Sequence, residues 1–247
     1  MERMSIGAAA KLSGLTIRTL QHYDNIGVLP ASGRNENGRR YYTEKDMIKL
    51  QHIVFYRGIG FSLEEIKEHL LGEAFDETHT QKLLNQQKIL LYNQIATIQN
   101  SIAALEASQE IVSLGSQPPW KLLTVFMTAL GKVDINHWQQ YEFNDELTAV
   151  IEENLPTLED VLEFYNKWKK LSIKAAAYQQ ANVPITSQPA KQLAQEWREM
   201  VCKATGDNPE NEAAYLHVDN DRETWNPAEK ELIETAEPYL EAILENE

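Results

Sequence analysis

Apolar residues near the start of the chain repeat at the spacing of short helices. We predict a helix over residues 5–12, because its apolar residues share one face and a Ser-Gly pair follows it. Thr16 can cap a second helix that extends to Asn25 or Ile26. Two short helices about a tight glycine turn are typical of helix-turn-helix proteins, in which the second helix enters the major groove. Many enzymes also contain paired short helices, so this pattern alone does not define a function.

A polar, glycine-containing segment at residues 32–38 predicts a two-stranded hairpin after this helix pair. The sequence Arg39-Arg40-Tyr41-Tyr42 forms its exit. Arginine and tyrosine side chains suit contacts with the phosphates of DNA. A hairpin in this position is the wing of a winged helix.

Two more helices complete the predicted N-terminal domain. Residues 43–46 cap a helix whose apolar residues keep helical spacing until a pair of glycines ends it. A capping box at Ser62 and Glu65 begins the last helix. We predict a winged helix-turn-helix DNA-binding domain over residues 1–75.

The segment 80–114 contains neither proline nor glycine and carries an apolar residue at every seventh position. This repeat predicts a coiled-coil helix roughly 50 Å long, at about 1.5 Å per residue. Polar Lys88 and Gln109 interrupt the repeat near its ends, and a long helix packed on its own domain is the alternative. We favour a dimerisation helix over residues 76–114, with a seam formed by Leu84, Leu91, Ile95, Ile98, Ile102, Leu105 and Val112.

The rest of the chain is helical in period. Residues 115–119, Gly-Ser-Gln-Pro-Pro, predict a short semi-rigid linker. We predict an all-helical domain over residues 120–247 and a mainly α fold for the whole chain. The expected helices cover residues 121–131, 145–153, 158–181, a segment capped by Ser187, 208–216 and 227–245.

Averaged over the chain, the net charge of −14 argues against nucleic-acid binding, because polyanions bind clustered lysine and arginine. The distribution of charge changes this conclusion. Residues 1–60 hold nine lysines and arginines and five acidic residues, whereas residues 121–247 hold eleven and twenty-four. A basic N-terminal domain therefore precedes an acidic C-terminal one.

Residues suited to catalysis or metal binding are sparse. The single cysteine, Cys202, can form neither an internal disulfide nor a cage of thiolates, and the six histidines lack zinc-binding spacing. We expect no catalytic site, metal or cofactor. No apolar run reaches the length of a membrane helix or a signal-peptide core, so we expect a cytoplasmic protein that does not bind membranes. We interpret Cys202 as a structural residue, with covalent attachment of a ligand as the alternative.

Two segments resemble the winged-helix domain of MerR-family transcription regulators. They are IRTLQHYDNIGVLP at residues 17–30 and NGRRYYTEKDMIKLQHIVFYRGIGFSLEEIKEHL at residues 37–70. The resemblance implies a homodimer through an antiparallel coiled coil, bound to a palindromic operator in double-stranded promoter DNA. It also implies that a ligand-driven distortion of the DNA realigns promoter elements for RNA polymerase.

The same resemblance gives roles to residues of the second helix and the wing. It implies that Thr16 and Arg18 open the recognition helix and that Tyr23 and Arg40 contact phosphates. An internal ion pair is the alternative for Arg18, and a core position is the alternative for Tyr23. Gln21 and His22, which lie between Arg18 and Tyr23, either read bases or face water. The predicted DNA-binding set is Thr16, Arg18, Gln21, His22, Tyr23, Arg39, Arg40 and Tyr42.

The C-terminal domain resembles the TipA-type antibiotic-recognition domain of some family members. The resemblance implies a globin-like helical fold with a deep drug-binding cleft, and aromatic walls suit flat, multi-ring ligands. We expect a hydrophobic small-molecule or peptide antibiotic as effector, with ligand contacts from Phe164, Tyr165, Trp168, Tyr178 and Trp197. A core position is the alternative for both tryptophans. The sequences that carry the resemblance are FYNKWKKL at 164–171, VPITSQP at 183–189, LAQEW at 193–197 and TGD at 205–207.

We therefore interpret the chain as a ligand-responsive transcription activator. A drug-sequestering resistance protein with little DNA activity is the alternative. Metal or redox sensing in this family requires clustered cysteines near the end of the coiled coil, and the sequence has only Cys202. Transfer of the ligand signal is expected to depend on the long helix and on the linker at residues 115–119.

Overall fold

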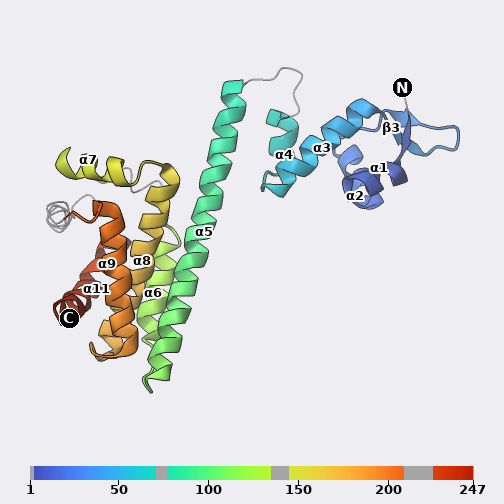
Figure 1. Ribbon diagram of the computed structural model, residues 1–247. Helices are drawn as coiled ribbons and strands as arrows, with labels where there is room; N and C mark the ends of the chain where they lie inside the picture. The colour runs from blue at the N-terminus through green and yellow to red at the C-terminus, as the bar shows by residue number, and fades with distance from the viewer. Residues whose placement is uncertain (1–2, 71–76, 135–144, 209–224, 247) are drawn as a thin grey trace. The chain divides into compact units, whose positions relative to one another are not determined.

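The computed structural model describes residues 3–70, 77–134, 145–208 and 225–246 (Figure 1). The chain forms two compact units, Met1–Lys88 and Ile89–Glu247. Each unit has a hydrophobic core of its own. Helix α5, Glu77–Ser113, is continuous through the boundary between the units.

The N-terminal unit begins with two short helices about a glycine turn, α1 (Ile6–Ser13) and α2 (Ile17–Asn25). Gly14 ends α1 with a left-handed φ of 69°, which glycine adopts at little steric cost. The Thr16 hydroxyl accepts the backbone N–H of Thr19 at 3.0 Å and so caps α2. The structure thus contains the predicted helix-turn-helix.

The wing is part of a three-stranded antiparallel sheet with the strand order β1, β3, β2. Strands β2 (Gly33–Arg34) and β3 (Arg40–Tyr42) form the predicted hairpin. Strand β1 (Met4–Ser5) was not predicted, because two residues give no alternating pattern and their partner strand lies far along the chain. The sheet thereby ties the wing to the start of α1.

The last helices of the unit begin at the predicted caps. Before α3 (Glu44–Gly58), the Asp46 carboxylate accepts the backbone N–H of Thr43 at 2.6 Å and its hydroxyl at 2.8 Å. Helix α4 (Leu63–Glu65) continues directly into a π-helix, Ile66–Leu70. These caps satisfy backbone groups that a helix leaves unpaired at its first turn.

The core of the N-terminal unit gathers side chains from the helix-turn-helix, the wing and the helices that follow. Its largest fully buried members are Leu20, Leu29, Tyr42, Leu50, Ile53, Phe61 and Ile66. Leu84, which we placed in the dimerisation seam, is half-buried against this same core. Within one chain, Leu84 therefore already has an apolar partner.

Every regular element described in the C-terminal unit is an α-helix. Figure 1 shows the second half of α5 beside α6 and α8, and alanines of α5 share one core with those helices. The expected linker, residues 115–119, lies inside this unit. Of the helix expected at 208–216, only residue 208 is among the described residues. The further helices are α6 (Trp120–Leu130), α7 (Asp145–Asn154), α8 (Leu158–Ala181), α9 (Gln188–Thr205) and α11 (Pro227–Glu245).

Helix α8 is the central element of this unit. It packs against α6, α9 and α11, and residues 171–178 are all buried. Two lysines of α8, Lys169 and Lys174, are almost fully buried. A buried ammonium group requires a charged or hydrogen-bonded partner, so α8 also determines where acidic side chains enter the core.

Candidate nucleic-acid interface and effector region

Helix α2 presents a polar face to solvent and an apolar face to the core. Arg18, Gln21 and His22 are exposed, and Gln21 and His22 lie three and four residues after Arg18, so both border Arg18 on one face of the helix. Leu20 and Tyr23 occupy the opposite, buried face. The Arg18 guanidinium forms no ion pair with any residue that the structure describes. This exposed face is suited to base edges in the major groove.

Two tyrosines of the predicted DNA-binding set lie in the core instead. Tyr42 is fully buried, and its hydroxyl has no hydrogen-bond partner among the described residues. Its assignment as a DNA contact is therefore wrong for this structure: alternation along β3 directs its side chain inward. Tyr23 is 6% exposed and belongs to the N-terminal core, as the core alternative for this residue expects.

The wing turn is organised by a single asparagine. The Asn35 side-chain oxygen accepts the backbone N–H groups of Asn37 at 3.1 Å and of Arg39 at 2.9 Å. Arg34 donates to the Gly38 carbonyl at 3.2 Å, where the left-handed φ of 71° favours glycine. Arg39 itself is exposed. The turn thus holds a cationic side chain at the tip of a short hairpin.

The second wing arginine has an internal partner. The Arg40 guanidinium lies 2.5 Å from the Asp24 carboxylate and 3.4 Å from the Asn25 side-chain oxygen at the end of α2. Asp24 also accepts the backbone N–H of Ala31 at 2.9 Å. That backbone hydrogen bond, with Arg40 beside it, lowers the pKa of Asp24. Arg40 therefore ties the wing to the end of α2, and its side chain is 18% exposed.

Helix α5 has two apolar faces with different surroundings. The face that packs in the C-terminal core consists of Ala96, Ala103, Ala107 and Ile111, all at most 6% exposed. The predicted seam lies on another face, and its members other than Leu84 are 39% to 64% exposed within one chain. Six large apolar side chains in one stripe form the kind of patch that marks an interaction surface. They are Leu91, Ile95, Ile98, Ile102, Leu105 and Val112.

Most of the predicted ligand-binding aromatics are core residues. Tyr165, Trp168, Tyr178 and Trp197 are each at most 9% exposed, and Phe164 is half-buried against them. This placement agrees with the core alternative for the two tryptophans. The Tyr165 and Trp168 rings are stacked, with centroids 6.2 Å apart, and the Trp225 ring meets Trp168 edge-on at 5.7 Å. The sequence identifies these aromatic residues, but it does not show whether their rings fill the core or line a ligand site.

A buried ion pair lies beside this aromatic stack. The Lys169 ammonium is 3.6 Å from the Glu229 carboxylate and 3.9 Å from the centroid of the Tyr165 ring, and the Tyr165 hydroxyl donates to Glu229. Burial lowers the pKa of Lys169, and Glu229 opposes that shift. No sequence pattern indicates this pair, because Glu229 belongs to α11, far along the chain from Lys169.

A second polar cluster connects α5 to α8. Glu110 accepts hydrogen bonds from the Lys174 ammonium, at 3.0 Å, and from the Tyr178 hydroxyl. Burial and the adjacent Glu110 carboxylate raise the pKa of Tyr178. The Tyr239 ring lies edge-on to Tyr178 at 5.7 Å. Tyr178, which we expected to contact ligand, is thus occupied by a contact with α5.

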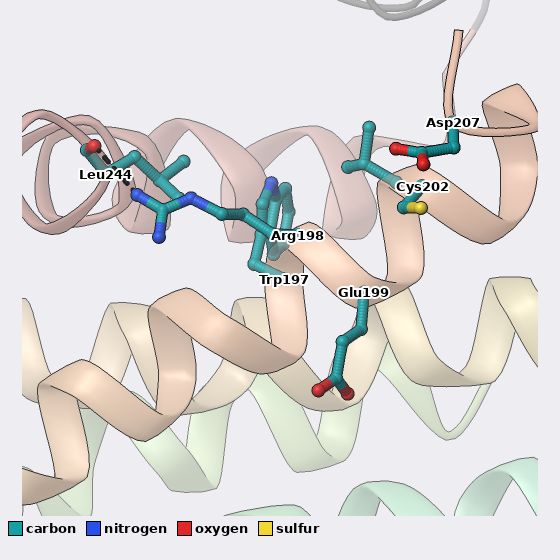
Figure 2. A pocket seen from close by; sticks show the side chains of 7 residues that line it. Trp197, Arg198, Glu199, Cys202, Asp207 and Leu244 are labelled. Carbon is teal, nitrogen blue, oxygen red and sulfur yellow. Dashed lines mark hydrogen bonds between the residues drawn. The ribbon is translucent and has the colours of Figure 1, made fainter. Parts of the chain in front are cut away.

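One cavity of about 540 Å³ opens between α9 and the end of α11 (Figure 2). The Arg198 guanidinium donates to the Leu244 carbonyl at 3.1 Å at one end of this cavity. Cys202 is half-buried near Asp207 at the other end. Of the predicted ligand-binding set, only Trp197 lines it. The lining residues are Trp197, Arg198, Glu199, Val201, Cys202, Asp207 and Leu244.

The described residues also bear on metal binding and on membrane crossing. Within the described residues, no group of three or more His, Cys, Asp or Glu side chains is arranged to hold a metal ion. None of the helices in the described ranges combines the length and the apolar character that crossing a membrane requires.

A helix-turn-helix followed by a wing, with cationic side chains on both, defines a winged-helix DNA-binding protein. Family profiles agree with this class. The profile for the MerR HTH family regulatory protein matches residues 4–73, and the profile described as MerR, DNA binding matches residues 48–111.

Full-length relatives extend the similarity beyond the N-terminal unit. The HTH-type transcriptional activator TipA of Streptomyces coelicolor is 30% identical over 256 residues, which cover 97% of this chain and 94% of that protein. The HTH-type transcriptional activator mta of Bacillus subtilis is 36% identical over 43% of each chain. The chain belongs to the MerR family of transcription regulators, and it is a homologue of the activator TipA along nearly its whole length.

Two solved structures are similar to part of this chain. MtaN, the N-terminus of the Bacillus subtilis multidrug transporter activator, is 37% identical, with a TM-score of 0.37 over 41% of this chain and 93% of that chain. HiNmlR, a MerR family regulator lacking the sensor domain and bound to promoter DNA, is 28% identical, with a TM-score of 0.35 over 45% of this chain and 91% of that chain.

Proposed function

We propose that this MerR-family regulator is a ligand-responsive activator that binds a palindromic promoter operator as a homodimer. Its effector is a hydrophobic drug or antibiotic bound by the C-terminal unit. Two exposed surfaces of the chain carry the proposal. The polar face of α2 can contact DNA, and the apolar stripe of α5 can pack against a second chain.

The DNA-binding part rests on Arg18, Gln21 and His22, which project from one face of α2, and on Arg39 at the wing tip. Arginine can donate a bidentate pair to guanine or to a phosphate. One short helix seldom supplies both affinity and specificity, so two copies on a palindromic site are expected. Arg40 acts indirectly by holding the wing against α2 through Asp24.

Dimerisation rests on the stripe from Leu91 to Val112. These side chains are exposed although they follow a heptad repeat, and covering them by a second α5 removes apolar surface from water. Leu84 contributes less to this seam, because it packs against the N-terminal core. RNA polymerase is the further partner of an activator of this kind.

Effector binding rests on the similarity to TipA and on the cavity beside Trp197. A mostly apolar wall with a few polar groups suits an amphipathic antibiotic. Because Tyr165, Trp168 and Tyr178 are enclosed, the expected first contact of the effector is Trp197 rather than these three.

One set of measurements on the full-length chain tests the proposal. The chain selects its operator from a pool of random double-stranded DNA, and light scattering gives the mass of the free and bound protein. Transcription by purified RNA polymerase from the selected site is then measured with each member of a panel of hydrophobic peptide and polycyclic antibiotics. We expect a palindromic site, a dimer, and increased transcription with at least one antibiotic that also raises the melting temperature. Antibiotic binding without DNA selection would instead identify a sequestering protein.

A further inference from the structure

Helix α5 connects physically to the effector region through a ladder of charged side chains. Glu106 and Glu110 are one helical turn apart on α5, and Lys170 and Lys174 are one turn apart on α8. The Glu106 and Lys170 side chains approach to 2.9 Å, and the Glu110 and Lys174 side chains to 3.0 Å. We call these two pairs, with Tyr178 on Glu110, the α5–α8 ladder.

The ladder determines the axial position of α5 relative to α8. Both pairs run in the same chain direction, so the helices lie parallel, as Figure 1 also shows. Sliding or turning one helix separates at least one pair. Lys174 is 4% exposed, so losing Glu110 would leave a buried ammonium without its partner, an arrangement that proteins avoid.

The ladder also lies next to the surface proposed for dimerisation. Glu106 follows Leu105 directly, and Glu110 lies one turn further along the same helix. The apolar stripe is on one side of the ladder, and the buried alanine face of α5 is on the other. A movement of α8 that pulls on Glu106 and Glu110 therefore moves the surface that would pack against a second α5.

We propose that the α5–α8 ladder transmits the effector state of the C-terminal unit to the dimer helix, with Glu110 as its central positioning residue. This inference rests on the proposed function and deepens its regulation. The signal then passes directly from α8 to α5 and bypasses the connection at residues 115–119, which joins the end of α5 to α6 along the chain.

Thermodynamic coupling between two sites is reciprocal, so DNA can serve as the test ligand when no effector is known. If the state of α8 changes the geometry in which two chains hold DNA, then DNA must change the state of α8 by the same factor. Hydrogen–deuterium exchange of α8 peptides is measured on the full-length chain with selected operator DNA and with random-sequence DNA. We expect operator DNA to change exchange in α8 by about 5-fold or more, the lower end of typical allosteric coupling.

Charge-reversal variants distinguish coupling through the ion pairs from coupling through helix packing alone. Glu106→Lys and Lys170→Glu, made singly, should each remove the operator-dependent change, and the double variant should restore it. Both side chains are about a third exposed, so these variants keep the fold. Glu110→Gln keeps an acceptor for Tyr178 but removes the charge facing Lys174, and it should also remove the change.

The matched control is an ion pair of similar length that does not involve α5. Lys203 on α9 and Glu163 on α8 approach to 3.1 Å, and reversing either should leave the response intact. The proposal is overturned if the single α5–α8 reversals keep the wild-type response, if the double reversal fails to restore it, or if the control reversals abolish it. Failure of the proposed function is seen separately, as failure to select an operator or absence of an antibiotic-induced thermal shift.

Discussion

The guanidinium of Arg40 contacts the carboxylate of Asp24 at 2.5 Å, and this contact joins the wing to the last turn of the recognition helix. The same carboxylate accepts the Ala31 backbone N–H at 2.9 Å. One acidic side chain therefore holds α2, the segment after it and β3 in a fixed arrangement. The positions of α2 and of the wing, the two elements proposed to contact DNA, depend on this arrangement.

Replacing Asp24 tests that role through its pH dependence. The pKa of folded Asp24 lies below its ordinary value of 3.8, so the folded state binds fewer protons than the unfolded state. The stabilisation is complete above the unfolded pKa and disappears as the pH falls through the folded pKa. At pH 7, Asp24→Asn should lower the free energy of unfolding by about 1 to 2 kcal/mol.

Denaturant unfolding of both proteins between pH 7 and pH 3 measures this difference. The two curves should converge toward the acidic end, because proton binding by Asp24 in the unfolded state lowers the stability of the wild type as the pH falls. Glu36→Gln, at an exposed acidic residue of the wing, is the matched control and should change the free energy of unfolding little. A difference between wild type and Asp24→Asn that stays constant with pH would contradict the assigned role.

Arg18 and Arg39 should differ in how they affect DNA binding. An arginine that reads a base edge contributes about 1 to 3 kcal/mol only on the correct sequence, whereas a phosphate contact weakens all sequences and lowers the salt slope by about one ion. We expect Arg18→Ala to behave as the first and Arg39→Ala as the second. Affinity for operator and random DNA over a salt series distinguishes them. Equal losses on both DNAs for Arg18→Ala would remove its reading role.

Local signals in the sequence located the helices and strands that begin or end at a recognisable residue. Thr16, Thr43, Ser62 and Ser187 precede helices in the structure as predicted, because a cap acts through neighbouring backbone groups. The polar, glycine-containing segment at residues 32–38 located the wing, and the seven-residue apolar repeat located the long helix. These features specify the fold class and the solvent-facing side of α2.

The sequence could not reveal contacts made between distant segments. Lysines are normally exposed, so nothing near Lys169 or Lys174 indicates that Glu229 and Glu110 would accompany them into the core. Tyr42 is in the predicted DNA-binding set because arginine and tyrosine side chains suit phosphate contacts, yet strand alternation turns it inward. The division of α5 between two cores also depends on which faces the later helices cover.

The apolar stripe of α5 predicts the oligomeric state. Leu91→Asp combined with Ile98→Asp places two charges in the seam and should yield monomers that lose specific DNA binding. Thr97→Asp combined with Gln99→Asp adds the same charges at exposed positions outside the stripe and should stay dimeric. Light scattering measures the mass, and a shift assay measures operator binding. A dimeric Leu91/Ile98 variant would contradict the proposed seam.

The free energy of unfolding should fall more when one partner of the buried α8–α11 ion pair is replaced than when both are replaced. Glu229→Gln leaves the Lys169 ammonium without a carboxylate in the core and should cost about 3 to 5 kcal/mol of stability. Lys169→Met combined with Glu229→Gln removes the uncompensated charge and should recover part of that loss. Denaturant unfolding of the three variants measures this. A double variant less stable than Glu229→Gln would show that the pair itself is a large source of stability.

Trp168 and Trp197 should have different roles although both are largely buried. Trp168 is enclosed by Tyr165 and Trp225, whereas Trp197 borders the cavity between α9 and α11. Trp168→Ala removes a core side chain and should cost about 3 to 5 kcal/mol. Trp197→Phe keeps an aromatic ring in the core but removes the indole N–H and part of the cavity wall.

Tryptophan emission during titration with the antibiotic panel separates the two positions. If the effector enters the cavity, wild type and Trp168→Phe should show quenching, and Trp197→Phe should lose most of it together with affinity. The melting temperature of Trp197→Phe without antibiotic should stay closer to wild type than that of Trp168→Ala. Full quenching in Trp197→Phe would place the effector elsewhere in the C-terminal unit, because the indole nearest the cavity would then be irrelevant to the signal.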